Sequence, residues 1–255
     1  MAYGDFLDAN ELTFAYSDRE SSALGLQIYR CCTTQWDRDS HEIAIKLNSS
    51  NADVVILRTK NVEPNFQAMD GDWISISAGE LVYWASPVNP RFGGLAKPLE
   101  YVAAQSKINE FADVVRRSFA DYKNHYSANP LFDRLSPEQA YVDWAIRRAS
   151  ETTTEDLAGL LLSNGQPVGA ISGVQIGTEV EIELAGIAPE FQGQGMYAHL
   201  IAGFWQTVND ATRSRIVIST QKENESVQKA WVRLGLSYEF SVVTTHLVRR
   251  TLIEQ

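Results

Sequence analysis

The sequence predicts an α/β fold, with a central mixed, twisted sheet flanked by helices and a small α/β domain on its N-terminal side. Strand-like and helix-like segments alternate along residues 105–250, which is typical of such folds. Hydrophobic residues make up 44% of the 255 residues, enough for a packed core. Three prolines and two glycines within residues 86–98 predict a linker, so we expect domains at 1–95 and 96–255.

The N-terminal domain is expected to be a small α/β layer. Short β-like runs predict strands at residues 24–32, 52–58, 73–77 and 81–85. Between the first two, Ser40 can cap a helix that carries Ile43, Ile45 and Leu47.

Two helices are predicted next. One starts at Ser106, and its apolar residues recur at about 3.6-residue spacing: Ile108, Phe111, Val114, Val115 and Phe119. The second starts at Ser136, because the run Ser-Pro-Glu-Gln supplies an N-cap, a proline at the first helical position and a capping-box glutamine. We expect it to bury Tyr141, Trp144 and Ala145.

The rest of the chain predicts a hairpin followed by alternating strands and helices. Residues 157–162 and 167–174 flank Asn164-Gly165, a strong signal for a two-residue hairpin turn. Further strands are expected at 179–187, 215–220 and 238–248, and helices at 195–209 and 224–234.

Charge and composition exclude several classes of partner. The net charge of −10 argues against nucleic acid, although backbone N–H groups at a helix start can still bind a phosphorylated ligand. No apolar run reaches the about 20 residues of a membrane span, and the N-terminus lacks a signal-peptide pattern. Cys31 and Cys32 are adjacent, a poor arrangement for a disulfide or a zinc site. We therefore expect a cytoplasmic protein without a metal.

One strand-to-helix turn carries the chemistry. Gly193 and Gly195 follow the strand at 179–187 and precede a helix, so the backbone can turn tightly and bring N–H groups close to a pyrophosphate. The plainer alternative is that the glycines only cap the helix. The turn is neither a Walker loop nor a dinucleotide fingerprint, since it lacks the Gly-Lys-Ser/Thr and the third glycine.

Two motifs here resemble the GNAT family of N-acetyltransferases. Ile187-Ala-Pro189 followed by Gln192-Gly-Gln-Gly-Met196 is similar to its signature Gln/Arg-x-x-Gly-x-Gly/Ala, from which Tyr197 departs. About 30 residues on, the run from Asn224 to Leu236 resembles the family's Asn…Ala…Gly-Phe helix. The resemblance covers residues 105–250 and implies an enzyme that transfers acetyl from acetyl-CoA to a primary amine.

The resemblance also implies the cofactor site. Two parallel strands should separate near a bulge, and the pantetheine arm should lie between them. The residues expected to bind acetyl-CoA are Ala185, Ile187, Gln192, Gly193, Gln194, Gly195, Met196, Tyr197 and Asn224.

The attacking amine requires a proton acceptor, and the resemblance implies Glu181, six residues before Ile187, where the family often has this base. Glu183 lies on the same side of the strand by the two-residue period. The alternative is that both are solvent-facing carboxylates. Where the family often has a tyrosine to protonate the leaving thiolate, this sequence has Trp231. Tyr238 and Tyr197 are the phenols that can replace it, and Tyr238 is our catalytic candidate. The alternative is that water or the ammonium proton of the substrate protonates the thiolate.

The order of domains and the loop at residues 122–134 are similar to dTDP-fucosamine acetyltransferases, which act on a nucleotide-linked amino sugar. That resemblance implies that His125 and Tyr126 bind the acceptor, with His125 acting as a base or as a sugar ligand. The alternative is that His125 is a surface residue, as loop histidines more often are. The alternatives are an acetyltransferase for an aminoglycoside, peptide or metabolite amine, or a non-catalytic sensor of acetyl-CoA. The sequence leaves the acyl length and a homodimer open.

Overall fold

The computed structural model describes residues 3–6, 12–66, 71–120, 122–133, 137–150, 156–208 and 212–254. The chain forms two compact units. Unit 1 contains Met1–Val82, Lys123–Leu135 and Phe240–Gln255, and unit 2 contains Tyr83–Tyr122 and Ser136–Glu239. The chain therefore passes from one unit to the other four times, whereas the sequence predicts one boundary near residue 95.

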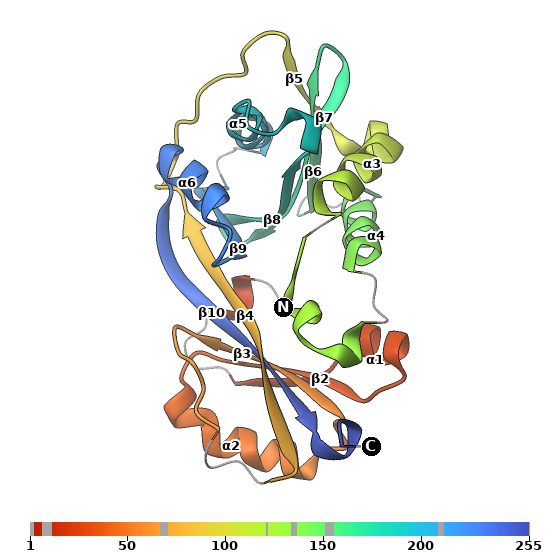
Figure 1. Ribbon diagram of the computed structural model, residues 1–255. Helices are drawn as coiled ribbons and strands as arrows, with labels where there is room; N and C mark the ends of the chain where they lie inside the picture. The colour runs from red at the N-terminus through yellow and green to blue at the C-terminus, as the bar shows by residue number, and fades with distance from the viewer. Residues whose placement is uncertain are drawn as a thin grey trace. The chain divides into compact units, whose positions relative to one another are not determined.

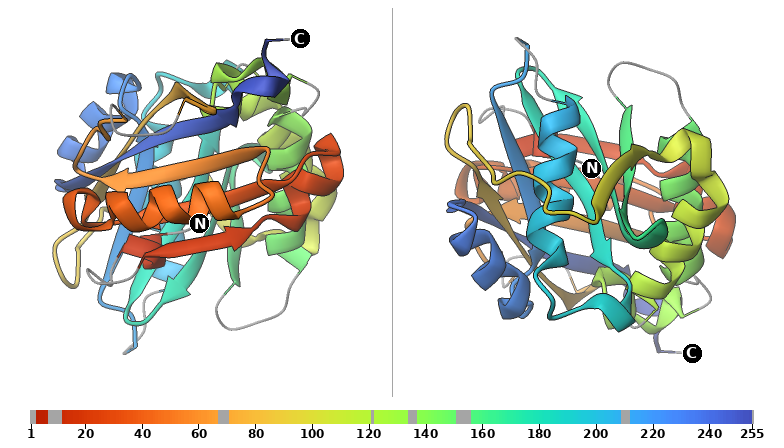
Figure 2. Two further views of the ribbon diagram at one scale, coloured as in Figure 1. Left: turned by 90° about the horizontal axis from the view of Figure 1, so that it is seen from below. Right: turned by 90° about the horizontal axis from the view of Figure 1, so that it is seen from above.

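Unit 1 is a five-stranded sheet with one long helix. Its strands follow the order β1-β2-β3-β10-β4. Their bounds are Thr13–Tyr16 (β1), Ile28–Thr33 (β2), Val54–Lys60 (β3), Trp73–Ala85 (β4) and Ser237–Arg249 (β10). β2 and β3 are parallel and are connected by α2 (Trp36–Ser49), which covers one face of the sheet (Figures 1 and 2).

The opposite face of the unit 1 sheet is covered by short helical turns. These are η3 (His125–Ala128) and η4 (Pro130–Phe132). Helix α1 (Asp18–Leu24) precedes β2 in the chain. Phe132 of η4 is buried against Ile28, Ile56 and Val248. Phe132 thus anchors the segment 124–132 to the unit 1 core.

Unit 2 contains five further strands, with helices on both of their faces. Its strands follow the order β9-β8-β7-β6-β5. Their bounds are Leu99–Ala103 (β5), Asp156–Ser163 (β6), Gln166–Ile176 (β7), Glu179–Ile187 (β8) and Arg215–Gln221 (β9). Neighbours from β5 to β8 are antiparallel, and β8 and β9 are parallel.

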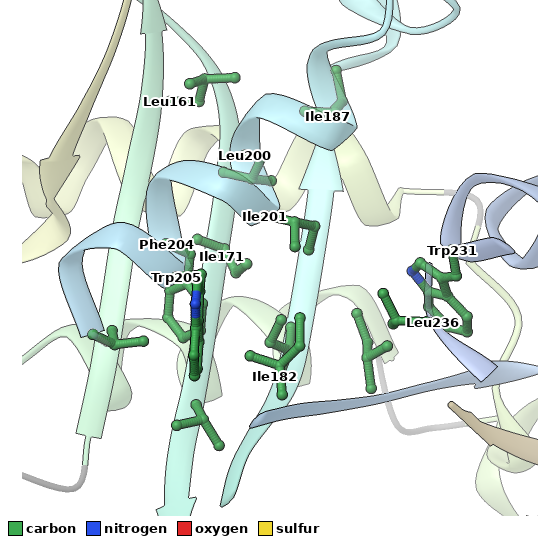
Figure 3. Packing of buried hydrophobic residues seen from close by; sticks show 14 of the residues in the cluster. Leu161, Ile171, Ile182, Ile187, Leu200, Ile201, Phe204, Trp205, Trp231 and Leu236 are labelled. Atoms are coloured by element: carbon green, nitrogen blue, oxygen red, sulfur yellow. The ribbon is translucent and has the colours of Figure 1, made fainter. Parts of the chain in front are cut away.

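Helix α5 (Met196–Val208) packs on one face of the unit 2 sheet, and α3 (Ile108–Phe119) and α4 (Pro137–Ser150) pack on the other (Figure 1). Helix α6 (Glu225–Arg233) follows β9. Figure 3 shows Leu200, Ile201 and Phe204 of α5 against Ile171 and Ile182 of the sheet. The two helical layers bury separate apolar clusters on opposite faces of the strands. Each buried strand residue therefore faces one helical layer or the other.

Most elements expected in unit 2 form where the sequence predicts them. Asn164 and Gly165 have φ values of 50° and 77° and close the hairpin between β6 and β7, as expected. Helix α3 buries Phe111, Val114 and Val115. Ser136, Asn209 and the side chain of Tyr141 lie outside the described residues.

Three expectations for unit 1 were wrong in detail. The strand expected at 24–32 begins only at Ile28, because α1 ends with Gly25 in the left-handed region at φ 69°. Helix α2 begins at Trp36 rather than Ser40, and its Ile45 is 55% exposed. The two strands expected at 73–77 and 81–85 are one strand, β4, which continues through Gly79 at φ 97°.

Candidate active site

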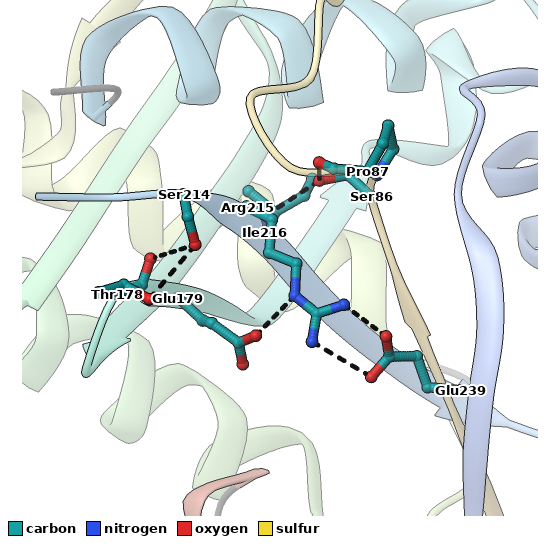
Figure 4. Close-up of polar contacts among 8 residues, drawn as sticks. All are labelled: Ser86, Pro87, Thr178, Glu179, Ser214, Arg215, Ile216 and Glu239. Atoms are coloured by element: carbon teal, nitrogen blue, oxygen red, sulfur yellow. Dashed lines mark hydrogen bonds and ion pairs between the residues drawn. The ribbon is translucent and has the colours of Figure 1, made fainter. Parts of the chain in front are cut away.

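The parallel strands β8 and β9 stay paired over only part of their length. Among the described residues, their ladder runs from Glu179↔Arg215 to Ile182↔Ile218, although both strands continue beyond it. At the paired end Arg215 binds Glu179 of β8 and Glu239 of β10 (Figure 4). The two strands are thus held together at their beginnings and separate toward their carboxyl ends.

A β-bulge lies where the strands separate. The antiparallel register of β7 with β8 passes from Ser172↔Leu184 to Gly173↔Ile182, so Glu183 is the extra residue. Ile182 packs in the cluster beneath α5, whereas Leu184 packs in the cluster beneath α3 and α4. The bulge therefore reverses which side chains of β8 face each side of the sheet.

The bulged residue is held by an ion pair. Arg148 of α4 binds Glu183 through two bonds, Nε to Oε2 at 2.8 Å and Nη2 to Oε1 at 3.0 Å. This fork geometry neutralises the carboxylate and fixes it in place. Of the described residues, those lining the nearby cavity include Glu183 but not Glu181, which is 5% exposed.

The turn after β8 places its two glycines in the left-handed region. Gly193 has φ 73° and Gly195 has φ 76°, which glycine adopts without strain. A Cβ atom at either position would meet no atom within 4 Å, so the space beside the turn is open. Gln192 holds the turn against β8, because its Nε2 donates to the Ile187 carbonyl at 2.9 Å.

Helix α5 begins directly after this turn, at Met196. The first N–H groups of a helix have no carbonyl partner within it, and the helix dipole favours an anion beside them. Gly193 and Gly195 line a cavity, and a side chain at either position would extend into open space. The turn therefore fits a diphosphate group of a cofactor such as coenzyme A.

A cavity of about 560 Å³ lies at the separated ends of β8 and β9. Eight of the nine residues expected to bind acetyl-CoA line it: Ala185, Ile187, Gln192, Gly193, Gly195, Met196, Tyr197 and Asn224. The ninth, Gln194, donates its side-chain amide to the Glu190 carbonyl at 3.1 Å. The structure thus brings together, in unit 2, residues that are spread over 40 positions of the sequence.

Asn224 is bound on both sides of its amide. Its Nδ2 donates to the Thr220 hydroxyl at 3.1 Å, and its Oδ1 accepts from the Ser226 hydroxyl at 3.0 Å. Burial raises the pKa of the nearby Tyr122 phenol, and hydrogen bonds from Thr220 and the Gln221 backbone partly oppose that rise. Asn224, Thr220 and Tyr122 thus line the cavity as a chain of hydrogen-bonded side chains.

Tyr197 of α5 and Trp231 of α6 meet in the cavity wall. The Trp231 Nε1 donates to the Tyr197 hydroxyl oxygen at 3.1 Å, and Trp231 is 1% exposed. Burial raises the pKa of the Tyr197 phenol, and the hydrogen bond from Trp231 partly opposes the rise. Tyr197 is therefore a neutral phenol at physiological pH.

Tyr238 lies elsewhere. Its side chain is 51% exposed and packs edge-on against Trp84, with ring centroids 6.2 Å apart. It is absent from the described residues that line the cavity. Of the two phenols singled out from the sequence, the structure brings only Tyr197 to the cavity.

His125 and Tyr126 both belong to unit 1. The His125 Nδ1 lies 3.0 Å from the Nε2 of His246, which is fully buried. The Tyr126 hydroxyl donates to Glu20 at 2.6 Å and accepts from Arg30 at 3.1 Å. Both side chains therefore have partners within their own unit.

Sequence reasoning missed several residues of the site, among them Ser118 and Arg148. Ser118 of α3 lines the cavity, and its buried hydroxyl has no hydrogen-bond partner within the described part of the chain. The feature of the sequence that could have pointed to Ser118 is Gly186, because a Cβ atom at Gly186 would lie 2.7 Å from the Ser118 Cβ. Arg148 gave no signal, because a basic residue in the last turn of a helix is common on its own account.

Other expectations concern metal, membrane and thiol chemistry. Across the described ranges, no group of three or more His, Cys, Asp or Glu residues is placed to hold a metal ion. None of the helices within those ranges is long and apolar enough to span a membrane. Cys31 and Cys32 are buried free thiols, and burial raises the pKa of Cys31.

Comparison with known proteins gives distant relatives. No family model matches the chain. The spore coat polysaccharide biosynthesis protein SpsD of Bacillus subtilis is 21% identical over 135 residues, which is 53% of this chain. The match spans 45% of SpsD, so the chain corresponds to less than half the length of that protein.

Solved structures resemble the chain over most of its length. A tandem GNAT protein from the clavulanic acid biosynthesis pathway has a TM-score of 0.55 at 12% identity, covering 87% of this chain and 75% of its own. A GNAT-family acetyltransferase from Colwellia psychrerythraea has a TM-score of 0.52 at 14% identity, with 86% and 75% covered. A conserved protein of unknown function from Staphylococcus epidermidis has a TM-score of 0.53 at 15% identity, with 98% and 97% covered.

These likenesses show that the chain has the fold of the GNAT N-acetyltransferases. The separated parallel strands, the bulge and the glycine turn agree with the resemblance drawn from the sequence motifs.

Proposed function

We propose that the protein is an N-acetyltransferase that uses acetyl-CoA. The observation that carries the proposal is the cavity between β8 and β9, which ends at the glycine turn and the start of α5. An extended arm fits between separated strands, and a diphosphate fits the helix start. One cavity thus offers sites for both parts of coenzyme A.

In this proposal the backbone of residues 192–197 holds the pyrophosphate, and the backbone of Ala185 and Ile187 holds the pantetheine arm. Acetyl-CoA supplies a thioester carbonyl that a neutral amine can attack. The protein contributes mainly by positioning both reactants, and backbone N–H groups stabilise the developing oxyanion.

The proton of the attacking amine requires an acceptor. Glu181 is our candidate, and its burial on the strand beside the bulge supports a role within the protein rather than at a solvated surface. Glu183 lines the cavity but already carries the Arg148 ion pair. Glu181→Gln should therefore lower kcat by about a hundredfold or more and remove the acidic limb of the pH profile. An unchanged profile would exclude Glu181.

For the acceptor we propose an amino sugar linked to a nucleoside diphosphate. Support comes from the sequence layout and from the partial likeness to SpsD, whose name places it in spore coat polysaccharide synthesis. His125 and Tyr126 are the proposed acceptor-binding residues. Tyr126→Phe should raise KM for the acceptor and leave acetyl-CoA affinity unchanged. Turnover of aminoglycosides or peptides, with nucleotide amino sugars inert, would overturn this acceptor class.

A second candidate function is a sensor that binds acetyl-CoA without turning it over. The observation that favours it is the Tyr197–Trp231 hydrogen bond, because both residues depart from the pattern of the resembled family.

As for location, the buried free thiols of Cys31 and Cys32 support our proposal of a cytoplasmic protein.

Titration calorimetry with acetyl-CoA, combined with a thiol-release assay on a panel of amines, tests the proposal. We expect binding together with acceptor-dependent release of CoA. Binding without release on any amine favours the sensor, and absence of binding rejects both functions.

A further inference from the structure

Two phenols share the cavity of unit 2. Tyr122 follows α3 and Tyr197 lies in the first turn of α5, and both line the cavity. They are close enough that the charge of one would raise the pKa of the other, in addition to the larger effect of burial. Both phenols therefore stay protonated and remain hydrogen-bond donors at physiological pH.

The direction of one hydrogen bond determines what Tyr197 can do. An indole N–H can only donate, so the Tyr197 oxygen must accept from Trp231 at 3.1 Å. The hydroxyl hydrogen of Tyr197 then remains for a second partner. Because a donor already polarises the phenol, its own O–H becomes a stronger donor.

The other hydroxyls of the cavity are less suited to stabilise an anion. Ser226 donates to Asn224, and Thr220 accepts from Asn224 and bonds to Tyr122. Ser118 has a buried hydroxyl without a protein partner in the described part of the chain, but an alcohol is a weaker donor than a phenol. Tyr197 is thus the best-prepared donor, and Ser118 is the competitor.

We propose that Tyr197 donates a hydrogen bond to the sulfur of coenzyme A as it leaves, and that Trp231 is the residue that positions Tyr197. This inference rests on the proposed acetyl transfer. In that step the amine nitrogen forms a bond to the carbonyl carbon, and the carbon–sulfur bond breaks with its electron pair on sulfur. The phenol keeps its proton, and the proton released by the amine finally neutralises the thiolate.

Binding measurements test the inference without turnover. Affinities of CoA and of desulfo-CoA, which lacks the sulfur, are measured at about pH 6.5 and about pH 9, on either side of the pKa of an ordinary thiol at about 8.5. A donor to the thiolate lowers the pKa of the bound thiol, so affinity for CoA rises with pH. We expect the ratio of CoA affinity to desulfo-CoA affinity to rise about tenfold between about pH 6.5 and about pH 9. This is the size of one hydrogen bond to a charged group.

The ratio of CoA affinity to desulfo-CoA affinity reports on the sulfur alone, because the two ligands differ only there. The other titratable side chains that line the cavity are Tyr122, Glu183 with its partner Arg148, and Arg233. Both ligands meet the same groups, so their titration cancels. Tyr197→Phe should abolish the rise, and Trp231→Phe should reduce it, while Tyr238→Phe, in an exposed phenol, should leave it unchanged.

Three outcomes overturn the inference. A full rise in Tyr197→Phe removes Tyr197 as the donor, even if the buried Trp231→Phe variant fails to fold. Loss of the rise in Ser118→Ala, with Tyr197→Phe unaffected, assigns the donor to Ser118. Absence of CoA binding by the unaltered protein rejects the proposed function and this inference with it. The first two leave the proposed function intact, so the two failures are distinguishable.

Discussion

The two units each contain a pair of parallel strands joined by a helix, and the pairs differ in one respect. In unit 1, β2 and β3 are paired over the whole of β2, from Ile28↔Val54 to Thr33↔Thr59. In unit 2, the β8–β9 ladder stops at Ile182↔Ile218. The same strand–helix–strand connection therefore gives a closed sheet in one unit and a cavity in the other.

Two local features account for the difference. Arg215 of β9 binds Glu179 of the paired strand β8 and Glu239 of β10, and it keeps the first half of the β8–β9 pair closed. Glu183 adds one residue to β8 where the pairing ends. The β2–β3 pair has an unshifted register throughout. A binding site thus arises here from an interrupted ladder, with the loops adding only the glycine turn.

The largest expected effect tests whether the open end binds a diphosphate. Gly195→Val should abolish acetyl-CoA binding, with an affinity loss of about a hundredfold or more, because the side chain fills the space before the α5 N–H groups. Titration calorimetry measures the loss. Gly165→Val is a matched control, since Gly165 has φ 77° against 76° for Gly195 and lies in the hairpin turn. Equal losses in both variants would assign the effect to backbone strain.

The next effect concerns the bulge. Arg148→Leu leaves the largely buried Glu183 without its ion-pair partner and should lower the free energy of unfolding by about 2–3 kcal/mol. Chemical denaturation measures this value. The exposed pair of Lys229 and Glu225 on α6 is the control, and Lys229→Leu should leave the free energy of unfolding nearly unchanged. Equal effects would show that the Arg148 pair does not hold the bulge.

Acid should act on the closed sheet of unit 1. Burial, with the nearby charge of Arg58, lowers the pKa of His246 to about 3, against about 6.5 when unfolded. As the pH falls, the unfolded chain therefore takes up a proton before the folded chain does. The contribution of His246 to the free energy of unfolding is full above pH 6.5 and is lost toward pH 3. Between pH 7 and about pH 5 the loss should be about 2 kcal/mol from this residue. His125 adds to it, since burial lowers its pKa too.

Thermal unfolding at the two pH values checks this expectation. His246→Leu should show a smaller shift than the unaltered protein, and His41→Gln, in an exposed histidine of α2, should show the same shift. A pH shift that is unchanged in His246→Leu would refute the assignment.

The smallest effect concerns Tyr238. Since its phenol is half exposed and does not line the cavity, Tyr238→Phe should lower kcat by at most about tenfold, or about 1.4 kcal/mol. Steady-state kinetics measure it. A thousandfold loss at unchanged acetyl-CoA affinity would show that Tyr238 is the acid after all.

The sequence predicted the fold well where local signals are strong. Asn164-Gly165 determines its hairpin by backbone preference alone, and the spacing of Phe111, Val114 and Val115 reports a buried helix face. Two strands, β1 and β5, were not predicted. Each has four or five residues and is at most half-buried, so neither shows an alternation of apolar and polar side chains.

The site was predictable through its glycine turn and through the motif that begins at Asn224, both of which line the cavity. Gly193 and Gly195 stand out because few other residues tolerate their conformation. The place of Tyr122 and Ser118 in the cavity depends on how α3 packs on β8, which is a contact distant in sequence. The bulge at Glu183 leaves no local pattern, since its carboxylate reads as an ordinary exposed strand position.

The strand order of unit 1 has a consequence for synthesis on the ribosome. β10 lies between β3 and β4, so the middle of this sheet comes from residues 240–249, made about 160 residues after β4. All of unit 2 emerges before that strand does. Until then β3 and β4 each present an unpaired edge, which is the usual starting point for aggregation. A fragment that ends at residue 95 would keep those edges permanently, so it should be recovered as insoluble chain.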